Sequence, residues 1–195
     1  MDWHAELALV TGIITAVAVV PYVRDMLRGT TRPNLVTWGL WLLIQAIFIS
    51  AQFSSGASWS VVLPLMEMVT VGIVFFLGLF GYGYKKYGRL DVVCLMIAIA
   101  AIALWQMTDE PMVALVLSVL ADFVAVIPTF KKSYLDPKSE TPSAYLLVVV
   151  ASVFAAASTT IVDAANLMWP IYIGALNGTV LCLILLGRRR KRGSI

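Results

Sequence analysis

Residues 60–81 read SVVLPLMEMVTVGIVFFLGLFG, an apolar run in which Glu67 is the one ionisable side chain. Its length matches the ~20 residues that an α-helix needs to cross a hydrocarbon core of about 30 Å. Because water is absent from that core, the segment must satisfy its own backbone polar groups, which favours a helix. The run is continuous, whereas a transmembrane β-strand alternates apolar and polar positions. It therefore predicts a transmembrane helix.

Six further runs of the same kind lie along the chain, at residues 5–23, 35–53, 90–106, 111–130, 143–161 and 167–186. Of the 195 residues, 61% are hydrophobic and 13% are charged. A soluble domain has about 25% charged residues, so the surplus apolar surface must face lipid. The sequence predicts an all-α membrane protein with seven transmembrane helices. The first run is not expected to be a cleaved signal peptide, because Asp2 and Glu6 replace the basic flank of such a peptide.

The basic residues occupy every second predicted loop and the C-terminal tail. They are Arg24, Arg28 and Arg32; Lys85, Lys86 and Arg89; Lys131, Lys132 and Lys138; and residues 188–192. The loops between these clusters contain no Lys or Arg. The positive-inside rule then predicts an N-terminus outside and a C-terminus in the cytoplasm of a multi-pass cell-membrane (plasma or inner membrane) protein. The net charge of +3 reflects this loop bias and gives no indication of nucleic-acid binding.

Two parts of the chain share a series of landmarks. The runs 5–23 and 111–130 each contain a proline near their end, Pro21 or Pro128, and are followed by a basic loop. The third runs align without gaps, because Pro64, Gly72 and Gly81 correspond to Pro170, Gly178 and Gly187. The run 90–106 has no counterpart. The sequence therefore predicts two parallel three-helix repeats, residues 1–84 and 111–195, joined by a linker helix within residues 85–110, a 3+1+3 plan.

Short motifs at the ends of these runs carry a resemblance to a known family. They are Pro21-Tyr22, Arg28-Gly29-Thr30-Thr31-Arg32-Pro33-Asn34 and Trp38 in the first half, and Pro128-Thr129-Phe130-Lys131-Lys132 and Glu140-Thr141-Pro142 in the second. With the 3+1+3 layout, the chain resembles a prokaryotic full-length member of the SWEET/PQ-loop transporter superfamily. The resemblance implies transport by alternating access, of a sugar, an amino acid or a vitamin-like metabolite. The chain departs from the sugar-transporting branch, because neither half has Gln after its first proline and runs 35–53 and 143–161 lack an interior proline.

Two prolines and three tryptophans are candidates for moving parts. A proline within a helix removes a backbone hydrogen bond, and the resemblance implies that Pro21 and Pro128 are hinges; the alternative is that they only mark helix ends. Trp38 and Trp41 are candidates for an inner gate, and Trp169 for an outer gate. The alternative for all three is the aromatic belt at the membrane interface.

Two carboxyl side chains lie deep inside predicted helices, Glu67 and Asp122. Ionisable groups there are costly, about 2.5–3.5 kcal/mol at a helix centre, and suggest function. No Lys or Arg lies inside a predicted span, so each carboxyl either is neutral or faces a wet cavity. We interpret both as candidates for proton coupling, with Asp122 and its same-face neighbour Ser118 also binding substrate. The alternative is a neutral carboxyl bonded to a neighbouring helix.

The candidate substrate pocket lies near the middle of the membrane, where repeats of this kind meet. Asn177 is midway along the last run and resembles an Asn that lines the substrate site of sugar-transporting relatives; the alternative is a hydrogen bond between helices. Gln45 and Ser152 lie at similar depth, and Tyr172 lies nearer the outer end. These four residues join Asp122 and Ser118 as predicted substrate-binding residues.

No enzyme, metal or cofactor motif is present. The one histidine is His4, the last run has no lysine for a Schiff base, and no Gly-rich phosphate loop, HExxH or GxSxG occurs. We therefore expect a carrier for a small polar metabolite that contacts lipid, needs no cofactor and is not an enzyme. The alternative is a receptor or sorting protein of the same architecture, which should place cationic groups in its cavity.

Overall fold

The computed structural model describes residues 2–84 and 110–192, together with residues 88, 89, 92, 93, 95, 96, 99, 100, 103 and 107. Six long α-helices dominate this described part of the chain. They are α1 (Trp3–Leu27), α2 (Leu35–Ser54), α3 (Val62–Leu77), α5 (Pro111–Leu135), α6 (Pro142–Ala157) and α7 (Ala164–Arg192). A 3-10 turn, Trp59–Val61, precedes α3, and a π-helical turn, Gly78–Tyr82, follows it. The expected linker helix at 90–106 lies largely outside the described residues.

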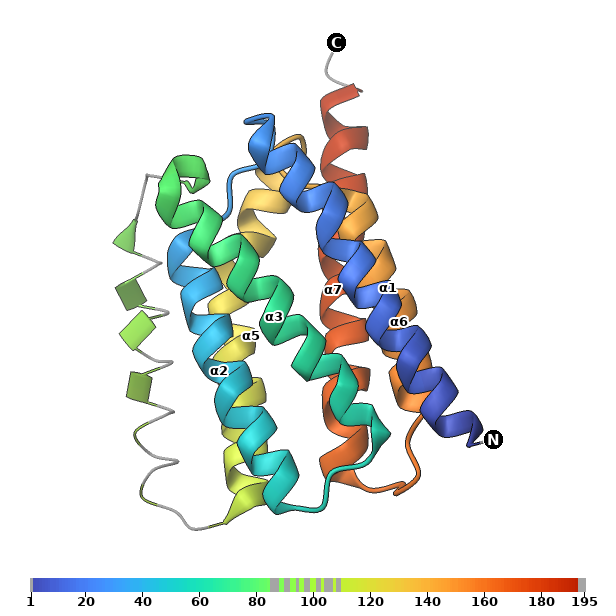
Figure 1. The fold of residues 1–195 in the computed structure, drawn as a ribbon. Helices are drawn as coiled ribbons and strands as arrows, with labels where there is room; N and C mark the ends of the chain where they lie inside the picture. The colour runs from blue at the N-terminus through green and yellow to red at the C-terminus, as the bar shows by residue number, and fades with distance from the viewer. Residues whose placement is uncertain are drawn as a thin grey trace.

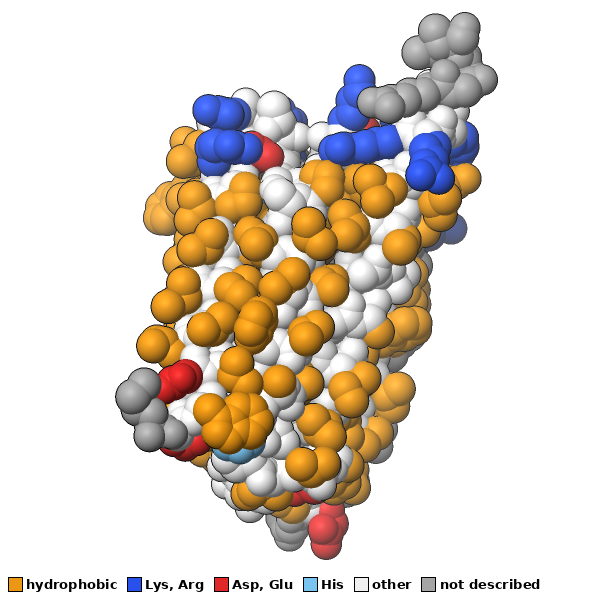
Figure 2. Space-filling model, turned by 90° about the vertical axis from the view of Figure 1, so that its right-hand side faces the viewer, with side chains coloured by type: hydrophobic (Ala, Val, Ile, Leu, Met, Phe, Trp, Pro, Cys, Tyr) orange, Lys and Arg blue, Asp and Glu red, His pale blue; other side chains and the backbone are white. Residues whose placement is uncertain are grey.

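Five of these helical segments are long and apolar enough to cross a membrane. Figure 2 shows apolar side chains over the middle of one face and Lys and Arg gathered at its upper end. The chain is therefore a membrane-embedded helical protein, as the sequence predicts. The exception is α6, whose 16 residues reach about 24 Å at 1.5 Å per residue. The equally long α3 is extended by the turns on either side of it, so that the whole segment runs from Trp59 to Tyr82.

The predicted end of the sixth run at residue 161 is wrong, because α6 ends at Ala157. Ser158 and Thr159 leave the helix and are buried. The Ser158 hydroxyl donates to the carbonyl of Ala155, and the Thr159 hydroxyl accepts a hydrogen bond from Ser58 in the loop before α3. Polar contacts thus replace the last helical turn that hydrophobicity alone predicts.

The interpretation that Pro21 and Pro128 mark helix ends is also wrong. Both prolines lie inside their helices, since α1 continues to Leu27 and α5 to Leu135. The turns beyond the prolines bury Met26 on α1 and Ser133 on α5, so packing holds them helical. Each helix therefore lacks one backbone hydrogen bond about two turns before its end.

The six helices close into a ring in the order α1, α6, α7, α5, α2, α3. Within the first half α3 lies between α1 and α2, and within the second half α7 lies between α5 and α6. The halves meet where α1 packs on α6 and where α2 packs on α5. In Figure 1, α1, α3, α5 and α7 run upward, α2 and α6 run downward, and the termini lie at opposite ends. Exchanging α1 with α5, α2 with α6 and α3 with α7 reproduces the same ring.

The aligned glycines that close the two halves have different roles. Gly81 follows α3 with a φ of 109°, a left-handed conformation that glycine adopts without a Cβ clash. Gly187 stays inside α7, where its Cα faces the backbone carbonyl of Tyr134 and the ring of Pro137. The first glycine therefore turns the chain, and the second allows α7 to approach the end of α5 closely.

Candidate functional site

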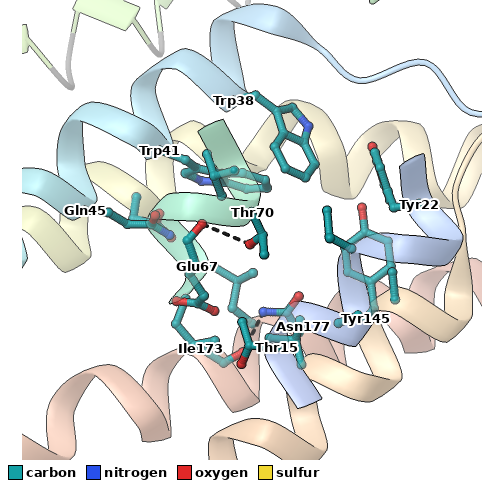
Figure 3. A pocket seen from close by; sticks show the side chains of 17 residues that line it. Thr15, Tyr22, Trp38, Trp41, Gln45, Glu67, Thr70, Tyr145, Ile173 and Asn177 are labelled. Carbon is teal, nitrogen blue, oxygen red and sulfur yellow. Dashed lines mark hydrogen bonds between the residues drawn. The ribbon is translucent and has the colours of Figure 1, made fainter. Parts of the chain in front are cut away.

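A cavity of about 90 Å³ lies inside the ring, and all six described helices line it. Figure 3 shows its side chains from close by. The polar and aromatic ones are Thr15, Tyr22, Trp38, Trp41, Gln45, Glu67, Thr70, Asp122, Tyr145 and Asn177. The remaining lining residues are Ala, Val, Leu or Ile. A small number of polar groups among apolar and aromatic walls is typical of a small-molecule site.

Helical spacing explains how the side chains reach the cavity. Residues three or four apart lie on one face of a helix, and the lining positions on most helices follow this spacing. Examples are Trp38, Trp41 and Gln45 on α2, and Ile173 and Asn177 on α7. The helix α5 contributes Asp122 alone among the lining residues. Five helix faces thus form the wall, and α5 presents a single carboxyl to it.

Two aromatic donors on α7 hold the two carboxyls of the cavity. The Tyr172 hydroxyl donates to Asp122 Oδ2 at 2.6 Å, and Trp169 Nε1 donates to Glu67 Oε2 at 2.7 Å. Both carboxyl residues are buried, with 2% of Asp122 and 6% of Glu67 exposed. The described residues provide no hydrogen bond to the second oxygen of either group. Each carboxyl is therefore fixed through one oxygen, and its other oxygen has no hydrogen bond from the described residues.

Further polar side-chain atoms of the lining also lack a hydrogen-bond partner among the described residues. Gln45 is 3% exposed, and its Oε1 has no hydrogen-bond partner among the described residues; the same holds for Trp41 Nε1. Asn177 Nδ2 donates to the carbonyl of Ile173 on its own helix at 2.9 Å. The alternative role of Asn177, a hydrogen bond to another helix, is therefore not the contact it makes.

Four of the predicted substrate-binding and gate residues do not line the cavity: Ser118, Ser152, Trp169 and Tyr172. Ser118 is buried on α5, and the Ser152 hydroxyl donates to the carbonyl of Val148. Trp169 and Tyr172 instead donate hydrogen bonds to Glu67 and Asp122, whose carboxyl groups do line it. The interface-belt alternative for Trp169 is wrong, because its side chain is fully buried and packs on Phe48 with ring centroids 4.3 Å apart.

Sequence reasoning missed Thr15, Tyr22, Thr70 and Tyr145 as lining residues. Tyr22 follows the hinge candidate Pro21 directly, and this adjacency is the one sequence signal that could have identified it. Thr70 lies three residues after the candidate Glu67, so helical spacing places it on the same face. Thr15 and Tyr145 lie on apolar helices with nothing in the local pattern to mark the face that looks inward.

A second, larger cavity of about 700 Å³ lies towards the basic end of the bundle, and we call it the vestibule. Its lining includes Arg32, Lys131 and Lys132, as well as the hinge candidate Pro128. Trp38 lines both the vestibule and the central cavity. Its ring lies 5.1 Å from that of Tyr22 and 5.2 Å from that of Trp41. This aromatic wall stands where the inner gate is predicted.

A buried ion pair connects the vestibule with the cavity wall. Lys132 Nζ lies 2.8 Å from Glu140 Oε1, and the side chain of Glu140 is 2% exposed. The hydroxyl of the cavity-lining Tyr145 donates to Glu140 Oε2 at 2.8 Å. Both carboxylate oxygens of Glu140 are thus engaged, and the charge of Lys132 is balanced within the protein.

The opposite end of the ring is closed by a buried polar cluster around Asn166. Its Oδ1 accepts from the backbone N–H of Ser58 at 2.9 Å and from Gln52 Nε2 at 3.4 Å. Its Nδ2 donates to Asp163 Oδ1 at 3.0 Å. Asn166, Gln52 and Ser60 are fully buried. The cluster ties α2, the loop before α3 and the start of α7 together, which closes this end.

We expect Asn166→Ala to lower the free energy of unfolding by about 1–3 kcal/mol, because it leaves the buried Ser58 N–H without its acceptor. Denaturation of the purified protein in detergent measures the effect. The control is Thr179→Ala on the same helix, where an exposed hydroxyl bonds only to its own backbone. Equal stabilities of the two variants would show that the cluster does not hold this end closed.

No family model matches the chain, and no curated protein or solved structure matches it. The resemblance in the short motifs therefore stays a prediction, and the function is argued from the cavity and its surroundings.

Proposed function

We propose that the chain is a membrane carrier that moves a small polar metabolite by alternating access between two three-helix repeats. The observation that carries the proposal is the central cavity, which all six described helices line and which shares Trp38 with the vestibule. Transporters built from repeats bind substrate near the bilayer midplane where the repeats meet. The ring order supports the repeat prediction, because exchanging the two sets of helices leaves it unchanged.

The proposed topology has seven spans, with the N-terminus outside and the C-terminus in the cytoplasm. Lys and Arg gather at one end of the bundle, so under the positive-inside rule this end faces the cytoplasm (Figure 2). The vestibule lies at the same end, while the Asn166 cluster closes the other. We propose that this arrangement is the inward-facing half of the transport cycle, in the cell membrane.

Flux into liposomes tests the proposal. The purified chain is reconstituted, and uptake of labelled sugars, amino acids, vitamins and organic amines is compared with that of empty liposomes. We expect saturable uptake of at least one solute, and its competition by the unlabelled solute. Uptake equal to that of empty liposomes across all four classes would count against a carrier.

Asp122 is the proposed site of proton coupling, with Glu67 as its neighbour in the cavity. In the flux assay, we expect Asp122→Asn to remove the dependence of uptake on an imposed pH gradient, because an amide cannot exchange a proton. The other titratable side chains of the cavity are Tyr22, Glu67 and Tyr145. The Glu6→Gln variant, at an exposed position in the first turn of α1, is the control. If uptake by Asp122→Asn still depends on the pH gradient, another group is responsible for proton coupling.

The two internal prolines are the proposed hinges. We expect the double variant Pro21→Ala/Pro128→Ala to slow uptake about tenfold with little change in substrate affinity, because alanine restores the helical hydrogen bonds that bending must break. Pro111→Ala is the control, since Pro111 starts α5, where proline costs nothing. An unchanged rate in the double variant would refute the hinges.

The receptor alternative also has one observation in its favour. Arg32 and Lys131 line the vestibule and supply the cationic groups that such a receptor needs for an acidic peptide. The liposome assay separates the two functions, because a receptor would bind an acidic peptide from the cytoplasmic side without saturable uptake of any solute.

A further inference from the structure

The charge of the central cavity restricts what it can bind. Glu67 and Asp122 both line it, and no Lys, Arg or His is among its described lining residues. Arg32, Lys131 and Lys132 line the vestibule instead, where Glu140 already balances Lys132. A ligand in the cavity therefore meets carboxyl groups and no fixed positive charge.

With both carboxyls ionised, the cavity contains several acceptor atoms that lack a donor. One oxygen of each carboxyl has no hydrogen-bond partner among the described residues, and the same holds for Oε1 of the buried Gln45. A buried acceptor without a donor is costly unless a ligand or water supplies one. The carboxyls and Gln45 come from three different helices, so a ligand with positive charge or several N–H donors would complete hydrogen bonds that the chain leaves open.

Aromatic rings form another wall of the same cavity. Tyr22, Trp38 and Trp41 follow one another with centroid separations of 5.1 and 5.2 Å, and Tyr145 also lines the space (Figure 3). The faces of such rings carry partial negative charge and attract cations, most strongly where water is excluded. These rings lie on α1, α2 and α6, whereas the carboxyls lie on α3 and α5. The aromatic wall is therefore a separate observation, and it favours the same class of ligand.

Other ligand classes fit less well. An anion or a zwitterion would bring a carboxylate towards Glu67 and Asp122, and no Lys, Arg or His of the described lining would balance it. A neutral sugar would use the acceptors but gain nothing from the two carboxyl charges. We infer, on the basis of the proposed carrier function, that the substrate is a small organic cation held between the carboxyls and the aromatic wall.

Ligand binding to the purified chain in detergent tests the inference without any transport. Trp38 and Trp41 line the cavity, so tryptophan fluorescence reports binding directly. The probes are two cations, choline and guanidinium, each paired with a neutral molecule of the same shape, 3,3-dimethylbutan-1-ol and urea. All are measured at matched ionic strength.

We expect at least one cation to bind ten times or more tightly than its neutral partner. In Asp122→Asn/Glu67→Gln this preference should fall at least tenfold, while Glu6→Gln, on the exposed first turn of α1, keeps it. If the double variant does not elute as a single species, the cation preference is measured instead in the nearly isosteric single variant Asp122→Asn, where it should also fall. Equal binding of cations and neutral partners, or a preference that survives the loss of both carboxyls, would overturn the inference.

The same measurements separate this inference from the carrier function. Cation binding without flux in liposomes would contradict the carrier and leave the ligand class standing. Saturable flux of a neutral or anionic solute, with no cation preference in binding, would support the carrier and overturn the ligand class.

Discussion

Gly187→Val is expected to destabilise the protein by about 3 kcal/mol or more, since it places a branched side chain where α7 meets the end of α5. A Cβ at this position would lie closer to the backbone carbonyl of Tyr134 than real Cβ atoms approach, and it would also touch Pro137. Backbone cannot move aside as a flexible side chain can, so the helices must separate. Overpacking alone typically costs about 1–3 kcal/mol, and a clash with backbone adds to this.

The matched control is Gly178→Ala on the same helix. A Cβ there would meet only Val149, at 4.0 Å, so no neighbour has to shift. Alanine also favours a helix over glycine by about 1 kcal/mol. We expect this variant to unfold at the same temperature as the parent or slightly higher in detergent. If Gly187→Val were as stable as Gly178→Ala, the close approach of α7 to α5 would not exist.

Trp169→Ala is expected to lower the free energy of unfolding by about 3–5 kcal/mol, the cost of truncating a large buried aromatic side chain. Trp169 is fully buried, packs on Phe48 and Tyr172, and donates a hydrogen bond to Glu67. Its removal leaves a cavity and a buried carboxyl without its donor. Chemical denaturation followed by circular dichroism measures the loss.

Trp169→Phe separates the two contributions. Phenylalanine keeps most of the contact with Phe48 but cannot donate to Glu67, so it should cost less than Trp169→Ala. Adding Glu67→Gln to Trp169→Phe should recover part of the loss, because the carboxyl that lacked its donor is gone. The exposed Trp3, which stacks on His4, provides the control Trp3→Ala with little expected effect. A Trp169→Ala variant no less stable than Trp3→Ala would contradict the packing described.

The membrane helices were predictable because their signal is length and hydrophobicity. All six described helices overlap their predicted runs, and α2 begins at the predicted residue 35. The errors lie at helix ends, where contacts beyond the apolar run decide how far the helix extends. The helix α6 stops before Ser158, and α1 and α5 continue past Pro21 and Pro128 because buried residues pack beyond them.

The inward faces of the helices were harder to predict. In a soluble helix the apolar stripe marks the core, but lipid is as apolar as a protein interior, so the stripe is absent here. Asn177, Asp122 and Gln45 could be selected because a polar side chain avoids lipid. Tyr22 and Tyr145 line the cavity while Phe80 is 83% exposed. Apart from the position of Tyr22 directly after Pro21, nothing in the local sequence distinguishes these aromatic residues.

Because the described helices of one chain surround the cavity, the proposed carrier function predicts that each copy of the protein contains a complete permeation route. Neighbouring copies in the bilayer would then work independently, whatever number of them associate. When inactive chains are mixed with active ones before reconstitution, total uptake should decline in simple proportion to the inactive fraction. If a route were shared between subunits, uptake would instead fall as a higher power of the active fraction.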